Sequence, residues 1–279
     1  MQTRPSLGRV IAQLLRRYRA HDVARDSAAL AYYLLFALFP LVVFLCLLPG
    51  VLQIDLSLFL QEAGRVIPND VVELLQSYIA YVSTQPSRSL LSFSLVFSVY
   101  FPWRAAQALL RSVRKAHGLG KPTHFLLYQF QVVLYTLCLL GSIVLSLLLL
   151  SSGRRVLSWV AQYLPLPLHW IDLWTPLRFV ILAGVVFLAL TVLYAMAWGW
   201  QDKAPIRHIF PGVAVSMAVW LLSSALFSLY VSQAGNYSVI YGSIGAFMVL
   251  LVWLYTSALI LIMGAELNDV LAQKPEDRL

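Results

Sequence analysis

The sequence predicts an all-α membrane protein whose chain crosses a bilayer several times. Its residues are 60% hydrophobic and only 11% charged, far outside the range of a soluble domain. The apolar residues also form long blocks instead of the spaced positions of an amphipathic helix. Between Arg207 and Glu266, 58 consecutive residues carry no formal charge. A bilayer core about 30 Å thick needs roughly 20 apolar residues per helix, so this run alone is long enough to cross twice.

Six apolar blocks predict six transmembrane helices in one membrane domain, residues 27–271. The expected spans are about 27–52, 89–110, 123–152, 177–200, 209–234 and 241–267, with short flanking tails at 1–26 and 272–279. The charge-free part of the second block covers only about 22 Å as a helix. That helix either starts upstream, near Tyr78, or carries Arg104 into the membrane and ends near Leu110. We favour the second alternative, with the Arg104 guanidinium reaching toward water at the helix end.

The distribution of lysine and arginine predicts the orientation of these spans. Fifteen of the 20 basic residues fall in the N-terminal tail, the connections after spans two and four, and the C-terminal tail. Such an excess marks the cytoplasmic side of a membrane. We therefore expect both termini in the cytoplasm, which an even number of spans also requires. The net charge of +8 is explained by this orientation, and we expect no nucleic-acid partner.

Two further segments are expected to lie at the membrane surface. In the N-terminal tail, apolar residues from Leu7 to Tyr18 share one helical face and arginines occupy the rest, which is typical of an amphipathic helix on an anionic leaflet. The connection 53–88 mixes acidic and apolar residues, and we interpret it as a helical outer loop. The predicted contacts with anionic lipid headgroups are Arg9, Arg16, Arg111, Arg114 and Lys115.

The sequence contains no motif of a metal, cofactor or nucleophile site. The five histidines are scattered without an HExxH pattern, and the two cysteines lie in apolar blocks. We therefore expect no metal, no cofactor and no enzymatic activity.

Glu266 is the most distinctive ionisable residue, because it ends the longest charge-free run. One interpretation is a gate or coupling site, with Asn268 two residues further on. The other, which we favour, is a structural carboxylate paired with a cation, for which Arg25, Arg104 and Arg207 are the candidates. A carboxylate at a helix C-terminus is disfavoured by the macrodipole, so a cationic partner is expected on either interpretation.

Other polar residues occupy the expected inner end of the first span. Asp26 follows Arg25 directly, and capping of the span is the favoured role for its carboxylate. Tyr32 and Tyr33 are either ordinary interfacial aromatics or part of a polar path through the bundle. Pro40, like Pro211, removes a backbone hydrogen bond, which creates either a hinge or a tolerated kink.

Several of these motifs resemble the YihY/BrkB family of bacterial inner-membrane proteins. The stretch Asp26–Tyr33 followed by Phe36–Pro40 is similar to its first span. The C-terminal likeness rests on Pro211-Gly212, Tyr230, Tyr241-Gly242-Ser243, Trp253-Leu254-Tyr255 and Gly264-Ala265-Glu266-Leu267-Asn268. The likeness covers nearly the whole chain, is looser from Gln53 to Leu173, and departs from the family at Pro102-Trp103-Arg104. It implies six spans, an inner-membrane location and a transport role in envelope biology; some members have carried a ribonuclease label.

The functional hypothesis is a transporter or flippase that acts on an envelope lipid or another amphiphile. Under this hypothesis a path or gate between spans one, two and six is formed by Tyr32, Tyr33, Pro40, Arg104, Tyr241, Glu266 and Asn268. Its expected partners are anionic lipids on the cytoplasmic side. The alternative is a non-transporting scaffold that binds an envelope protein, in which the same residues serve packing only.

Overall fold

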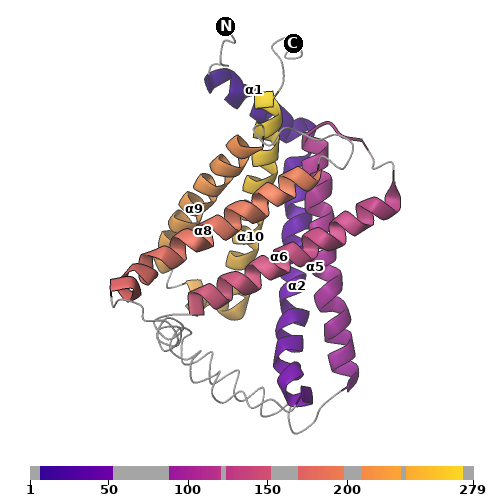
Figure 1. Cartoon of the computed structure of the whole chain (residues 1–279), viewed down its shortest axis with the longest axis vertical. Coiled ribbons are helices and arrows are strands. Elements are labelled where there is room, and N and C mark those ends of the chain that lie inside the picture. Colours follow the sequence, from indigo (N-terminus) through magenta and orange to yellow (C-terminus); the bar gives the residue numbers. More distant parts are fainter. Residues whose placement is uncertain are drawn as a thin grey trace. The chain divides into compact units, whose positions relative to one another are not determined.

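The computed structural model describes residues 7–52, 88–120, 124–151, 169–197, 209–233 and 237–272, and these residues are helical almost throughout. The helices are α1 (Leu7–Ala20), α2 (Val23–Leu52), α5 (Arg88–Ala116), α6 (Phe125–Ser151), α8 (His169–Ala197), α9 (Phe210–Gln233) and α10 (Tyr237–Ala272) (Figure 1). The described residues contain no strand, and the predicted all-α class is confirmed for them. The predicted outer loop lies outside the described residues, apart from Arg88.

Four of the described helices are long and apolar enough to cross a membrane. Their apolar segments are Phe125–Ser142, Val180–Ala197, Phe210–Tyr230 and Phe247–Ala272. The other two predicted spans correspond to α2 and α5, which contain 30 and 29 residues. The count of six spans and the cytoplasmic position of both termini stay predictions.

The chain divides into two compact units. The first comprises residues 1–35, 103–139 and 186–279, and the second comprises 36–102 and 140–185. In the first, buried Leu110, Val113, Val132, Leu193 and Ile262 belong to one hydrophobic core. In the second, aromatic rings of α2 and α5 meet, with the Phe36 and Phe101 centroids 5.8 Å apart. The polar sites described below belong to the first unit.

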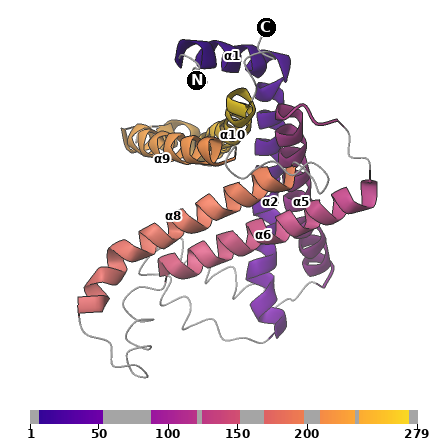
Figure 2. The same cartoon turned by 45° about the horizontal axis from the view of Figure 1, so that its top comes forward.

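A two-residue corner joins α1 to α2. Asp22 has a φ of 53°, a left-handed conformation that Asp adopts more readily than most residues. Because the chain turns there, α1 lies across the end of α10 in the first unit (Figure 2). The corner also places α2's first residue at Val23, ahead of the expected start. Asp26 therefore lies inside the first turn, where its charge complements the macrodipole, and it is not the helix cap predicted above.

The C-terminal end of α5 is closed by a glycine. Gly118 adopts a φ of 63°, and its amide donates to the Lys115 carbonyl at 3.0 Å. The next amide, of Leu119, donates to the Arg114 carbonyl at 3.0 Å, which completes a Schellman motif. The helix thus continues beyond the predicted end near Leu110, because the residues up to Ala116 pack into the core instead of leaving the bundle.

Two glycines bring α9 and α10 into close contact. A β-carbon on Gly212 would overlap the backbone carbonyl oxygen of Gly264, and one on Gly264 would overlap the hydroxyl groups of Ser216 and Tyr194. The space so created is polar: Tyr194 Oη lies 3.0 Å from Ser216 Oγ and donates to the Leu261 carbonyl at 2.6 Å. Polar groups bonded in this way hold adjacent apolar helices in a fixed register.

The start of α9 is fixed by a residue of α10. The Gly212 amide, one of the first-turn donors that no helical carbonyl can reach, donates to Asn268 Oδ1 at 2.6 Å. Pro211 lies in the same turn, where its missing N–H would have had no helical partner. The hydrogen bond that Pro211 was expected to remove is therefore not lost.

We predict that Gly212→Ala lowers the free energy of unfolding by about 1–3 kcal/mol, because the added methyl group meets backbone that cannot move freely. Thermal unfolding of the purified protein in detergent measures this loss. The matched control is Gly184→Ala in α8, where nothing lies within 4 Å of the added carbon. Equal melting temperatures for the two variants would contradict the close contact.

Candidate functional site

The C-terminal part of α10 carries a fully buried carboxylate. Glu266 is 0% exposed, although it follows a long apolar segment of the helix. An ionised carboxylate in such surroundings needs charged or hydrogen-bonding partners, because burial alone costs several kcal/mol. Those partners come from α1 and from the residue that follows it.

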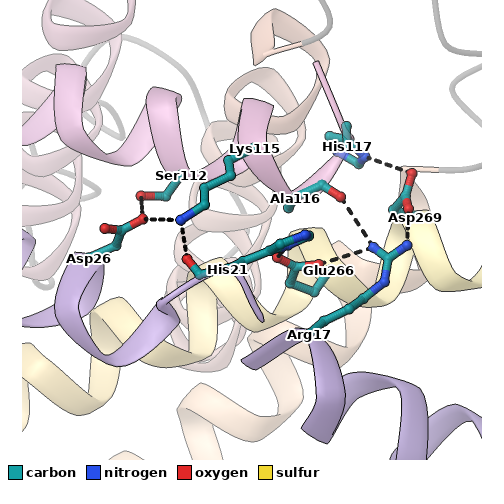
Figure 3. Close-up of polar contacts among 9 residues, drawn as sticks. All are labelled: Arg17, His21, Asp26, Ser112, Lys115, Ala116, His117, Glu266 and Asp269. Atoms are coloured by element: carbon teal, nitrogen blue, oxygen red, sulfur yellow. Dashed lines mark hydrogen bonds and ion pairs between the residues drawn. The ribbon is translucent and has the colours of Figure 1, made fainter. Parts of the chain in front are cut away.

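Arg17 of α1 holds two carboxylates of α10 at once. Its Nη1 lies 3.0 Å from Glu266 Oε2, and its Nη2 lies 2.5 Å from Asp269 Oδ2 (Figure 3). The two acidic residues are three apart and so share one face of the helix. Arg17 Nη1 also donates to the Ala116 carbonyl at 3.2 Å, one of the free carbonyls at the end of α5. A single guanidinium thus joins α1, α5 and α10.

Two histidines complete this group. His21 Nδ1 lies 2.5 Å from Glu266 Oε1, and His117 Nδ1 lies 3.8 Å from Asp269 Oδ1. We refer to Arg17, His21, His117, Glu266 and Asp269 as the carboxylate cluster. With both imidazoles neutral, two carboxylates face one guanidinium, so the cluster carries one net negative charge. Protonation of one imidazole would balance it.

A second ion pair lies next to the cluster. Lys115 donates to the His21 carbonyl, and its Nζ lies 3.8 Å from Asp26 Oδ2. Ser112 Oγ donates to the same Asp26 oxygen at 3.3 Å (Figure 3). The first turn of α2 is thereby fastened to the last turns of α5, beside the helix that carries Arg17.

A separate polar group lies further from the end of α5. Arg104 is 12 residues before Ala116, or about 18 Å along the helix. Its Nη2 donates to the Tyr33 hydroxyl and its Nη1 to Gln107 Oε1, both at 3.0 Å. Its guanidinium carbon also lies 5.3 Å from the centre of the Tyr33 ring, within range of a cation–π interaction. We call Tyr33, Arg104 and Gln107 the arginine site.

The partners of Glu266 differ from those expected. Arg25 pairs with Asp22 at 3.1 Å and Asp26 at 3.8 Å, and its side chain is 72% exposed. Arg104 belongs to the arginine site, and Arg207 lies outside the described residues. Glu266 thus has the cationic partner that was expected, but it is neither Arg25 nor Arg104, because α1 packs against α10 and places Arg17 there.

The lipid-contact candidates fall into two groups. Arg9, Arg16 and Arg111 have exposed side chains. Arg114 and Lys115 instead turn inward: Arg114 donates to the Ala197 carbonyl at 2.9 Å and the Gly120 carbonyl at 3.2 Å, while Lys115 is bound as described above. Both cations thus have carbonyl partners within the protein, and their contact with headgroups stays a prediction.

The proposed path residues of the first unit whose side chains are described fall into separate groups, and the path as a whole stays a prediction. Tyr33 and Arg104 meet, Glu266 lies in the carboxylate cluster, and Asn268 binds the start of α9. Tyr32 is 49% exposed, and its ring packs edge-on against that of Tyr33. Pro40 lies within α2 in the second unit, and Tyr241 lies in the part of α10 where only the backbone is described.

Arg17, His21, His117 and Asp269 were not among the predicted site residues. A signal for Asp269 was present, since it follows Glu266 by three positions on the same helical face. Arg17 also interrupts the apolar face of α1 between Leu14 and Tyr18, which an ordinary surface helix would not require. Among the described residues, no three histidine, cysteine or acidic side chains are grouped in a way that could hold a metal ion.

We predict that Arg17→Gln lowers the free energy of unfolding by about 3 kcal/mol, because it leaves Glu266 buried without its guanidinium. Backbone amides of α1 should exchange faster with deuterium, since the tie to α10 is lost. The control is Arg16→Gln, which removes the same charge from an exposed position one residue away. Unchanged protection of α1 in Arg17→Gln would contradict this role.

Comparison with known proteins agrees with the resemblance in the sequence. Residues 14–279 match the family model described as virulence factor BrkB. The chain is 27% identical to the ribonuclease-like protein YfkH of Bacillus subtilis, covering 95% of both chains. It is 26% identical to a UPF0761 membrane protein of Coxiella burnetii, covering 94% of this chain and 92% of the relative. No solved structure matches the chain. The matched length, together with the apolar helices, shows that the chain is a membrane protein of the BrkB family.

Proposed function

We propose that the protein is a transporter of the bacterial inner membrane that moves an envelope lipid or another amphiphile, as a flippase does. In this proposal α1 acts as a gate over the cytoplasmic end of the first unit, and the carboxylate cluster holds the gate closed. The excess of basic residues in the predicted cytoplasmic segments supports this orientation. So does the contact of α1 with the C-terminal part of α10, because the first described helix and the end of the last one lie side by side.

The observation that carries the proposal is the complete burial of Glu266 among ionisable partners. Buried ion pairs contribute little net stability, because desolvation offsets much of their attraction. Apolar residues would pack the same helices without that cost, so the charges point to a functional role. In membrane proteins, ionisable residues within apolar helices commonly mark substrate or proton pathways.

The outer face of α1 supports the choice of an amphiphile. Ile11 and Leu15 are exposed there, 49% and 62%, next to the arginines at positions 9, 16 and 19. An exposed apolar strip bordered by arginines matches the boundary between acyl chains and anionic headgroups. The same helix therefore contacts the cluster on one side and has the composition of a lipid-binding surface on the other. We extend no nuclease activity to this chain from its ribonuclease-like relative, since its sequence carries no nuclease metal motif.

Reconstitution into proteoliposomes tests the proposal. A fluorescent phospholipid in the inner leaflet becomes accessible to an added reductant only if the protein moves it across. We predict transfer by the wild type, and at least about a tenfold slower or faster rate for Glu266→Gln, equivalent to about 1.4 kcal/mol in the barrier. Arg25→Gln, which removes a cation whose side chain is 72% exposed and which does not contact Glu266, serves as the control.

The alternative of a membrane scaffold predicts a different result. No envelope lipid would then move, and a protein partner would co-purify in fixed stoichiometry. If Glu266→Gln transfers lipid at the wild-type rate, the protein is a transporter whose mechanism does not use the carboxylate cluster.

A further inference from the structure

The arginine site contains a cation that no described acidic residue balances. Arg17, Arg25 and Lys115 each lie near a carboxylate. Arg104, by contrast, is bound by a phenol oxygen and an amide oxygen, both neutral. Its position is also unlike that of Arg114, which meets carbonyls at the ends of helices, where partial negative charge collects.

One nitrogen of the Arg104 guanidinium has no hydrogen-bond partner among the described residues. This nitrogen is Nε, and it is buried. A guanidinium has five N–H groups in a planar fork, and Nε together with one terminal nitrogen can bind two oxygens of one anion. The edge that would bind an anion in this way is therefore not satisfied within the described protein, while the other contacts hold the plane of the fork in place.

The surroundings of this fork suit an amphiphile. The Tyr33 ring stacks near the cation, and Tyr32, beside it, is half exposed. Arg104 and Tyr33 themselves keep part of their surface exposed. An anionic group would therefore approach from the exposed part of Arg104 and Tyr33, and it reaches the buried Nε once the side chains over that atom move aside. An attached apolar chain would remain against the aromatic side chains.

We propose that Arg104 binds the oxyanion, a phosphate or a carboxylate, of the amphiphile that the protein handles, with Tyr33 and Gln107 as positioning residues. This inference rests on the proposed function and gives its substrate a chemical class. Arg is suited to the role because it stays charged in an apolar environment and matches the geometry of a phosphate. An anion bound there would also supply the missing counter-charge.

Binding to the purified full-length protein in neutral detergent tests the inference. The probes are dioleoyl-phosphatidylglycerol and dioleoylglycerol, which differ in the phosphoglycerol headgroup, with bound lipid counted by native mass spectrometry. For the wild type we expect the phospholipid to bind at least about tenfold tighter. Arg104→Gln should reduce this ratio to within about twofold of unity, because charge-assisted hydrogen bonds are lost. Arg104→Lys should retain part of it, since charge remains without the fork.

The control is Arg25→Gln, which removes an exposed cation and should leave the preference unchanged. A wild type that binds both lipids equally would overturn the inference without any variant, so a folding defect in Arg104→Gln does not decide the matter. Retention of the preference in a folded Arg104→Gln would overturn it too. If inorganic phosphate competes with the same affinity as the phospholipid, Arg104 binds a soluble oxyanion. The claim that its ligand is an amphiphile would then be overturned.

The binding and transfer assays separate this inference from the proposed function. Phospholipid preference that depends on Arg104, without transfer in proteoliposomes, would leave the binding site standing and remove the transporter. Transfer in proteoliposomes without a preference for the phospholipid would keep the transporter and remove the oxyanion site at Arg104.

Discussion

The first unit depends most on the contact of one guanidinium with two carboxylates. Arg17 bonds Glu266 and Asp269 of α10 and the terminal carbonyl of α5, so three helices distant in sequence meet at one side chain. If α1 lay elsewhere, Glu266 would lose its guanidinium and the last turn of α5 would keep an unpaired carbonyl. The position of His21 follows, because it lies in the corner after α1, where its carbonyl also accepts a hydrogen bond from Lys115 of α5.

Packing between α9 and α10 supports that contact from the other side. The close approach at Gly212 and Gly264 fixes the register of α10, and Asn268 holds the start of α9 through its side chain. Glu266 and Asn268 lie two positions apart and so serve different neighbours. One face of this part of α10 carries charge toward α1, while another bonds the backbone of α9. A shift of α10 along its axis would disturb both sets of bonds.

The helices were largely predictable from the sequence, and the site only in part. Long apolar blocks leave few alternatives to helices, because unpaired backbone groups are too costly in a bilayer. Glu266 stood out because a lone charge after a long apolar run is expensive. Its partner could not be read from the sequence, since hydrophobic patterning shows that α1 has an apolar face but not whether that face meets lipid or protein. The carbonyl partners of Arg114 and Lys115 could not be read from the sequence for a related reason: Ala197 and His21 belong to distant parts of the chain, whose positions depend on the tertiary fold.

A double-mutant cycle on Arg17 and Glu266 tests the central contact most directly. Free energies of unfolding would be compared for the wild type, Arg17→Gln, Glu266→Gln and the double variant. The structure predicts a coupling energy of at least about 1.5 kcal/mol, so the double variant should lose clearly less stability than the sum of the two single losses. Losses that add to within about 0.5 kcal/mol would show that the two side chains do not interact, and would contradict the contact on which the arrangement of the helices rests.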